Sequence, residues 1–290
     1  MPTLGTDRKS TIIRPIETAD IGPVMRLMES AWRVHLRLSP AELRARLKKL
    51  PAFLAEDRVG VRGFAVLEPL PAGLGMLVAA GLRDTWRVTP YLDLFLPVLS
   101  QTARYHNLRA LVHIGSAEWL NEPLQAHGFG IKEWIVAFER SNPTPPPEPV
   151  QISAELRSAH ISDLPALLEL DNTTFEHIWH KSGGTISEAL ARAASFTVAL
   201  VDGQIVAYQW CELYGQHAHL TRLAVDPNFQ GRGIGAQLLH RAMADVLAMG
   251  ATRITLNTQE TNQRSQTLYK RFGFTNTRQR LPVLWLALPA

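Results

Sequence analysis

Cysteine is nearly absent from this sequence: Cys211 is the only one among 290 residues. A single cysteine excludes an intramolecular disulfide and any zinc site built from several cysteines. Because Cys211 lies in a strand-like stretch, we expect it to be a small buried residue. Long apolar runs are absent too, since none reaches the roughly 20 residues that a membrane helix needs. The residues 1–11 hold three charges and no apolar core, so no signal peptide is predicted. We expect a cytoplasmic protein without membrane association.

The sequence also lacks runs of like charge. The formal net charge is +4 and the isoelectric point is about 9.4, which suits an anionic ligand. The basic residues are spread along the chain, so nucleic acid is not an expected partner. With 46% hydrophobic and 19% charged residues, the chain has the composition of a globular protein. Its length is enough for two domains, each with its own core.

A proline-rich segment at 141–150 divides the chain near its middle and contains five prolines. Closely spaced prolines restrict φ and remove backbone donors, so an extended linker is expected there. The predicted domains are therefore 1–140 and 151–290.

The two halves show an internal repeat. An arginine, an aspartate and a following apolar residue recur 143 positions apart, and a Gly-Phe pair recurs 145 positions apart. We therefore expect two copies of one fold. The matching residues are Arg14 with Arg157, Asp20 with Asp163, Ile21 with Leu164, and Gly128-Phe129 with Gly273-Phe274.

Each half predicts an α/β fold of the α+β type, in which a mixed, mostly antiparallel sheet is flanked by helices. The turn Asp202-Gly203 between two apolar runs indicates a hairpin. In the second half the expected elements are a strand at 151–156, a helix from 162 to 170, a helix at 176–192 broken at Gly183-Gly184, strands at 196–201, 205–213 and 216–225, a helix at 234–249, a strand at 254–257, a helix at 263–272 and strands within 274–288. In the first half they are a capped helix starting at 39–42, strands at 53–67, 74–80 and 110–114, and helices at 93–105 and 119–127.

A glycine-rich turn, 230–236, joins an expected strand to an expected helix. Glycines there let backbone N–H groups converge at a helix N-terminus, where phosphate oxygens bind. The first half has no glycine at the matching positions 87–91, so only one such seat is expected. A dinucleotide fold would need an acidic residue after the next strand, which ends in Asn257-Thr258. A Walker motif would need Gly-Lys-Ser or Gly-Lys-Thr, which does not follow this turn.

Around this turn the sequence resembles the GNAT superfamily of acetyl-CoA-dependent N-acetyltransferases. The resemblance covers about 151–290, and the first half is similar only in outline, which indicates a tandem GNAT protein with a degenerate first copy. The residues that carry it are Leu223-Ala224-Val225-Asp226-Pro227, Gln230-Gly231-Arg232-Gly233-Ile234-Gly235, Asn262, Leu268-Tyr269 and Phe272-Gly273-Phe274.

The resemblance implies acetyl-CoA as cosubstrate, with no metal. In the family, the strand that ends at Val225 bulges and separates from the next strand, so that its backbone can pair with the pantetheine arm. The pyrophosphate would lie on the amides of the glycine turn. The cofactor-binding residues that the resemblance implies are Leu223, Ala224, Val225, Gln230, Gly231, Arg232, Gly233, Ile234, Gly235, Ala236, Asn262 and Tyr269.

Tyr269 matches the family's general acid, which protonates the departing thiolate. The structural alternative is a tyrosine ring packed in the core. For the base, Asn257 stands where one branch of the family has a glutamate and cannot serve, whereas His219 stands where another branch has one. An imidazole is a credible base at neutral pH. Glu212 and His217 are the alternatives.

The acceptor is expected to contact the segment 175–181. Its residues Glu176, His177, Trp179 and His180 could line a pocket for a cationic amine, or the tryptophan could belong to the core with solvated neighbours. The two histidines have no third ligand nearby in the sequence, so a metal site is not expected.

The sequence therefore predicts transfer of an acetyl group to a primary amine, on a small molecule, a protein N-terminus or a lysine, by direct attack. The tandem arrangement is also similar to that of mycothiol synthase, which acetylates a small aminosugar thiol. A silent acetyl-CoA sensor or scaffold and a different nucleotide-binding fold are the alternatives. The oligomeric state and the relative orientation of the domains are not predicted.

Overall fold

The computed structural model describes residues 11–141, 144, 146–147, 149 and 153–289. Half of the expected linker at 141–150 and the start of the strand expected at 151–156 therefore lie outside the described residues. The chain forms two compact units. The first contains residues 1–133 and 281–290, and the second contains residues 134–280.

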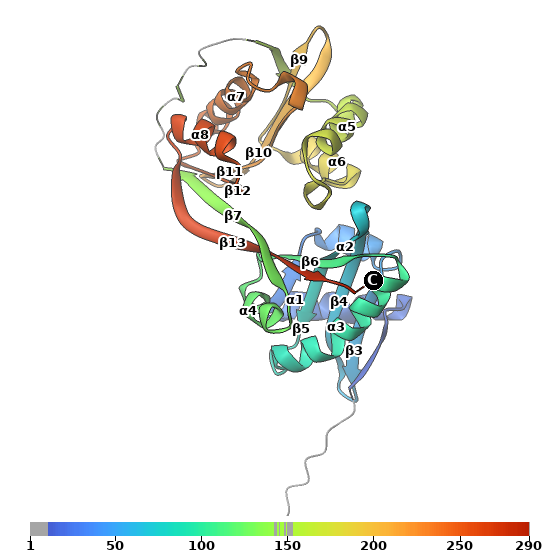
Figure 1. Ribbon diagram of the computed structural model, residues 1–290. Helices are drawn as coiled ribbons and strands as arrows, with labels where there is room; N and C mark the ends of the chain where they lie inside the picture. The colour runs from blue at the N-terminus through green and yellow to red at the C-terminus, as the bar shows by residue number, and fades with distance from the viewer. Residues whose placement is uncertain (1–10, 142–143, 145, 148, 150–152, 290) are drawn as a thin grey trace, which may run out of the picture. The chain divides into compact units, whose positions relative to one another are not determined.

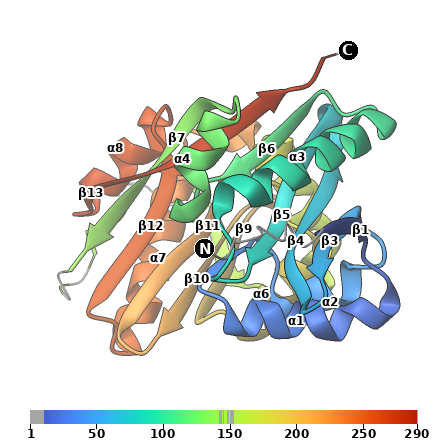
Figure 2. The ribbon, with the colours of Figure 1, turned by 90° about the horizontal axis from the view of Figure 1, so that it is seen from below.

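The first unit is a mixed sheet with helices on both faces. Its sheet order is β1-β3-β4-β5-β6-β13, and β2 also pairs with β5. Helix α3 lies along β4, β5 and β6, as Figure 2 shows. The elements of this unit are β1 Ile12–Pro15, α1 Ile21–Ser30, β2 Arg33–Leu36, α2 Pro40–Arg46, β3 Ala52–Asp57, β4 Gly60–Leu70, β5 Leu74–Leu82, α3 Val88–Tyr105, β6 Ala110–Ile114 and α4 Glu118–Ala126, with 3-10 turns at Thr18–Asp20 and Pro71–Gly73.

The second unit repeats this plan with the sheet order β13-β7-β12-β11-β10-β9-β8. Helices α5 and α6 cover one face, and α7 and α8 cover the other (Figure 1). Its elements are β7 Gly130–Arg140, β8 Glu155–Ser158, α5 Leu164–Thr174, α6 Gly183–Arg192, β9 Ser195–Val201, β10 Gln204–Tyr214, β11 His217–Val225, α7 Ile234–Ala248, β12 Arg253–Gln259, α8 Gln263–Arg271 and β13 Thr275–Ala287, with 3-10 turns at Ile161–Asp163, His177–Trp179 and Pro227–Phe229.

Each unit is completed by a strand from the other half of the sequence. Residues 135–140 of β7 pair with β12 and add Phe138, which is fully buried, to the core of the second unit. Residues 283–287 of β13 pair with β6 and add Leu284, also fully buried, to the core of the first unit. The units therefore do not follow the division at 141–150, because sheet pairing joins segments that are distant in the sequence.

The repeat seen in the sequence is a repeat of structure. Arg14 binds the carboxylate of Asp20 at 2.6 and 2.9 Å, and Arg157 binds that of Asp163 at 2.7 and 2.9 Å. In each unit this ion pair ties the first strand to the start of the first helix.

The main strands and helices lie close to their predicted positions. The hairpin turn is present, with Asp202 and Gly203 at φ 49° and 77°. One prediction is wrong: the stretch 176–182 is not helical apart from the short turn His177–Trp179, and the glycines at 183–184 begin α6 instead of breaking a longer helix. The reason is tertiary, because this stretch bonds to groups on α5 and β11. The strands β1, β2 and β7 were not predicted.

Candidate functional site

The site is built on β11, which carries a bulge. Trp210 of β10 lies opposite Arg222, and the next residue, Cys211, lies opposite Leu220, so that Thr221 is an extra residue. The parallel pairing of β11 with β12 covers His217 to Leu220 and ends there. The expected bulge and separation of strands are therefore both present.

Beyond the bulge, alternate peptide groups of β11 face away from β10. The amide of Asp226 donates to the carbonyl of Val206 at 2.9 Å, and by alternation Ala224 also bonds to β10. The peptide groups of Leu223 and Val225 then point to the opposite edge. In the described residues no strand pairs with this edge, although the carbonyl of Val225 accepts from the side chain of Gln230 at 2.9 Å. An amide-rich ligand could pair along this edge as an added strand.

The glycine turn provides a set of unpaired amides at the end of the same strand. Gly231 and Gly233 have φ of 85° and 84°, a conformation that favours glycine, and Gly233 is the N-cap of α7. Within the described chain the N–H groups of 231–235 have no hydrogen-bond partner, whereas that of Ala236 donates to the carbonyl of Gly233 at 3.0 Å. The nest therefore consists of five amides at a helix N-terminus, which suits a diphosphate.

Two arginines lie beside this turn. Arg232 stacks on Phe229 at 4.8 Å and donates to the carbonyl of Asn228 at 3.1 Å. Arg264, which was not predicted from the sequence, donates to the side chain of Gln230 at 2.7 Å. The Nη2 atom of Arg264 lies 3.3 Å from the position that a Cβ would have at Gly231. Arg264 thus brings a positive charge to the glycine turn from α8.

Helix α8 also carries Asn262 and Tyr269. The side-chain oxygen of Asn262 caps the helix by accepting from the amide of Ser265 at 3.0 Å, which leaves its amide nitrogen for a ligand. The ring of Tyr269 packs in the core, as the structural alternative expected. Its centroid lies 6.2 Å from that of the Phe138 ring and 6.1 Å from that of the Phe274 ring. Burial raises the pKa of its hydroxyl to about 12, against the opposing effect of the Ser265 hydroxyl. The phenol is therefore protonated at neutral pH and able to donate.

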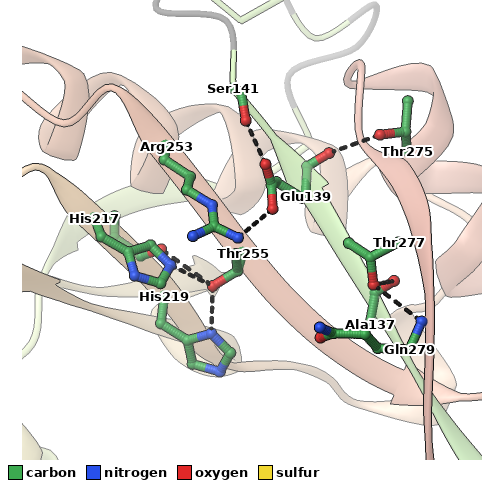
Figure 3. Close-up of polar contacts among 11 residues, drawn as sticks. Ala137, Glu139, Ser141, His217, His219, Arg253, Thr255, Thr275, Thr277 and Gln279 are labelled. Carbon is green, nitrogen blue, oxygen red and sulfur yellow. Dashed lines mark hydrogen bonds and ion pairs between the residues drawn. The ribbon is translucent and has the colours of Figure 1, made fainter.

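The two histidines of β11 share one hydroxyl group (Figure 3). His219 Nδ1 and His217 Nε2 each lie 2.9 Å from Thr255 Oγ1, which also lies 3.4 Å from the carbonyl of Ala218. If the hydroxyl donates to that carbonyl, both rings donate to the hydroxyl oxygen. His219 then has its free electron pair on Nε2. Thr255 was not predicted from the sequence because it lies on β12.

Glu212 lies directly opposite His219 in the register of β10 and β11. Its carboxylate accepts from the hydroxyls of Tyr214 at 3.0 Å and Thr221 at 3.1 Å, so the bulge residue holds it in place. Burial lowers the pKa of His219, and the negative charge of Glu212 opposes that effect. His219 is therefore neutral at pH 7 and can accept a proton. Nearby, Arg253 forms an ion pair with Glu139 of β7 (Figure 3).

The segment 175–181 is held against β11 by a buried ion pair. Asp171 is fully buried and accepts from Arg222 Nε at 2.8 Å and from the amide of Lys181 at 2.8 Å. Arg222 also donates to the carbonyl of Trp179 at 2.8 Å and lies 3.4 Å over the ring of Phe175.

Within this segment Glu176 and His177 are exposed, whereas Trp179 and His180 are partly buried. The ring of His180 donates from Nε2 to the carbonyl of Phe175 at 2.8 Å and lies 4.9 Å from the ring of His177. No group of three or more His, Cys, Asp or Glu side chains in the described residues could hold a metal ion. Cys211 is buried, and burial raises its thiol pKa to about 12. No described helix is long and apolar enough to cross a membrane.

Comparison with known proteins identifies the class of this site. Residues 164–274 match the model of the acetyltransferase (GNAT) family. The second unit therefore contains a GNAT acetyltransferase domain.

Among its relatives is a Bacillus subtilis protein named as an N-acetyltransferase of an alanine of ribosomal protein bS18, which is 24% identical over 124 residues, 43% of this chain and 82% of that protein. Another is the mycothiol acetyltransferase of Acidimicrobium ferrooxidans, 29% identical over 142 residues, 44% of this chain and 45% of the relative. The chain thus spans about half the length of that enzyme. Among solved structures, a tandem GNAT protein from the clavulanic acid biosynthesis pathway shares the fold with a TM-score of 0.65 and 15% identity, over 97% of this chain and 99% of that protein.

Proposed function

We propose that the second unit transfers an acetyl group from acetyl-CoA to a primary amine by direct attack. The observation that carries this proposal is the edge of β11 at Leu223 and Val225, which no described strand covers. This edge leads into the five amides at 231–235, which have no partner among the described residues. The edge matches the peptide-like groups of a pantetheine arm, and the amides match a diphosphate. Arg264 would add a charge to the diphosphate, and the free amide nitrogen of Asn262 would face the arm.

In the proposed reaction acetyl-CoA supplies an acetyl thioester. The neutral amine forms a bond from its nitrogen to the acetyl carbon, and the bond from that carbon to sulfur breaks. His219 Nε2 accepts the proton that the amine loses, directly or through water, while Thr255 holds the ring. Tyr269 donates a proton to the departing sulfur, since its raised pKa keeps it protonated.

For the acceptor we propose an amine on a small molecule or on a protein, with the segment 175–181 as its contact. Glu176 could attract an ammonium group, and the exposed ring of His177 offers a polar contact. The relatives named for an aminosugar thiol and for a protein alanine give two starting points for a screen.

The proposal is tested by measuring thiol release with acetyl-CoA and a panel of amines that includes aminosugars, alanine-starting peptides and lysine peptides. We expect turnover with at least one amine, and a Tyr269→Phe variant that binds acetyl-CoA normally but turns over about 100-fold more slowly. The Phe274→Leu variant is a control for packing around the same ring. Cofactor binding without turnover on any amine would instead indicate a sensor, and an unimpaired Tyr269→Phe variant would remove Tyr269 as the acid.

A further inference from the structure

The two units place equivalent segments differently after their first helices. In the first unit α1 ends at Ser30 and the chain forms β2, which pairs antiparallel with residues 79–82 of β5. In the second unit α5 ends at Thr174, and the chain passes through the segment 175–181 without joining the sheet. The same position in the fold is thus a strand in one unit and a turn in the other.

The edge that β2 covers is the counterpart of the free edge of β11. In the first unit Val66 lies opposite Ala79 and Leu67 lies opposite Leu77, so Val78 is an extra residue, as Thr221 is in the second unit. The parallel pairing of β5 with β6 ends at Met76, just before this bulge. Beyond the bulge β2 pairs with β5, whereas no described strand pairs with the corresponding edge of β11. The first unit therefore fills with its own chain the edge that the second unit leaves open.

Three polar side chains of the second unit form a buried cluster that binds the backbone of the segment 175–181. Arg222 and Tyr208 both bind the buried carboxylate of Asp171, and burial raises the pKa of the Tyr208 hydroxyl, which donates to that carboxylate. Through these bonds Asp171 and Arg222 hold the carbonyl of Trp179 and the amide of Lys181. These backbone groups are therefore bound to the side chains of Asp171 on α5 and Arg222 on β11, and are not available to pair with a strand.

The first unit has apolar residues at the three equivalent positions. Aligning the two bulges matches Arg222 with Ala79 and Tyr208 with Phe64. Aligning the two helices by the Arg-Asp pair at their start matches Asp171 with Met28. All three are buried, at 0%, 0% and 8% exposure. In the first unit no polar group at these positions holds the segment away from the sheet.

We propose that Asp171, Tyr208 and Arg222 are positioning residues that keep the segment 175–181 off the edge of β11, and that β2 permanently closes the equivalent edge of the first unit. The proposal rests on the proposed function in assigning the edge of β11 to acetyl-CoA. It assigns one acetyl-CoA to each chain. It also predicts a competition when the buried ion pair is absent. The segment 175–181 and acetyl-CoA would then compete for the backbone groups of β11 at 222–225.

Hydrogen exchange on the unmodified protein tests the first part. Without ligand, amides in 222–225 should exchange faster than those in 79–82. The reason is that residues 79–82 pair with a strand on each side, β2 and β4. Saturating acetyl-CoA should protect 222–225 and leave 79–82 unchanged, with a calorimetric stoichiometry of one. A stoichiometry of two, or added protection at 79–82, would overturn the assignment for the first unit.

The second part is tested by giving the second unit the residues of the first, with the triple variant Asp171→Met, Tyr208→Phe and Arg222→Ala. Replacing a whole buried ion pair by apolar groups avoids leaving one charge alone, so the variant is designed to fold. We expect 222–225 to gain protection without ligand and the Kd for acetyl-CoA to rise about tenfold, as when only a tenth of the molecules are open. The control Arg192→Ala, which removes an exposed ion pair of α6, should change neither.

The outcomes distinguish a failure of the proposed function from a failure of the positioning role. If the unmodified protein does not bind acetyl-CoA, the proposed function fails. If it binds and the triple variant melts lower but shows no added protection at 222–225, the three residues act only on stability and the positioning role is wrong. If the triple variant does not fold, Arg222→Lys, which keeps the charge, is compared with Arg222→Gln. Only the glutamine variant should weaken acetyl-CoA binding, and equal binding by the two would also contradict the proposal.

Discussion

At the scale of single residues, the proposed proton transfers depend on His219 and Tyr269. His219 has one nitrogen bound to Thr255 and the other available, and its pKa is lowered by burial. Tyr269 has a raised pKa. The two environments shift the groups in opposite directions, one toward a neutral base and one toward a protonated acid, which is the division of roles that acyl transfer to an amine needs.

The assignment of His219 predicts a change in the pH profile. Since its pKa lies below 6.5, the unmodified enzyme should keep the base in its active neutral form down to mildly acidic pH. His219→Ala should lower kcat about 100-fold and should lose most at low pH, where the amine itself is rarely deprotonated. Steady-state assays from pH 5.5 to 9 check this, with a substitution of the exposed His106 in the first unit, His106→Ala, as the control. An unchanged profile would remove His219 and favour Glu212.

A second residue-scale prediction concerns stability in the first unit. His35 and His113 are buried with their rings 4.5 Å apart, and burial lowers their pKa values to about 4 and about 3. In the unfolded chain both titrate near 6.5, so below that pH the unfolded state binds more protons than the folded state. The free energy of unfolding should therefore fall, by about 1 kcal/mol per pH unit for each histidine, between pH 6.5 and about 4.

Denaturant unfolding at pH 7 and pH 5 measures this slope. His113→Leu should make it shallower, whereas substitution of the exposed His106 should not. A slope that is unaltered in His113→Leu would show that other groups cause the acid sensitivity.

At the scale of elements, the glycine turn distinguishes two kinds of glycine. Gly233 has φ of 84°, so an added Cβ is strained there by roughly 1–2 kcal/mol. Gly235 has no positive φ, and its Cβ would meet Leu268 and Val225 at the ordinary distances of 3.6 and 3.7 Å. Gly233→Ala should therefore weaken acetyl-CoA binding at least tenfold, and Gly235→Ala should change it little. Calorimetry on both variants checks the expectation, and equal losses would argue against the role of the turn conformation.

The segment 175–181 shows that tertiary hydrogen bonds can outweigh the local preference of the sequence. Its apolar residues Phe175, Ile178 and Trp179 have the i, i+3, i+4 spacing that favours a helix, and the structure has only one turn there. Bonds to Asp171 and Arg222 outweigh the local preference, because a buried carboxylate and guanidinium must find partners wherever the backbone offers them.

At the scale of the whole molecule, the exchange of β7 and β13 predicts how the chain can be divided. A fragment 151–290 lacks the β7 residues that pair with β12, among them the buried Phe138. A fragment 134–280 keeps them. We expect 134–280 to melt cooperatively and to bind acetyl-CoA, and 151–290 to be less stable and to bind weakly. Circular dichroism melting and calorimetry compare the two, and equal stability would mean that β7 is dispensable.

The sequence predicted much of the fold and of the cofactor site because their signals are local. The Asp202-Gly203 hairpin, the capped start of α2 at Ser39 and the glycine turn each depend on neighbouring residues, and each is present. The halves could be recognised as copies because the Arg-Asp pairs recur at one spacing. The acid and base assignments remain predictions.

What only the tertiary structure decided is which distant segments meet. The strands β7 and β13 could not be assigned to their sheets, because a strand's partners depend on pairing across more than 100 residues and leave no local pattern. Thr255, Arg264 and the Asp171 to Arg222 pair join the candidate site for the same reason. The sequence by itself determined a GNAT acetyltransferase domain beside a copy without the glycine turn. The structure decided that this copy closes its own sheet edge with β2, because hydrogen bonds between strands form through space and not along the chain.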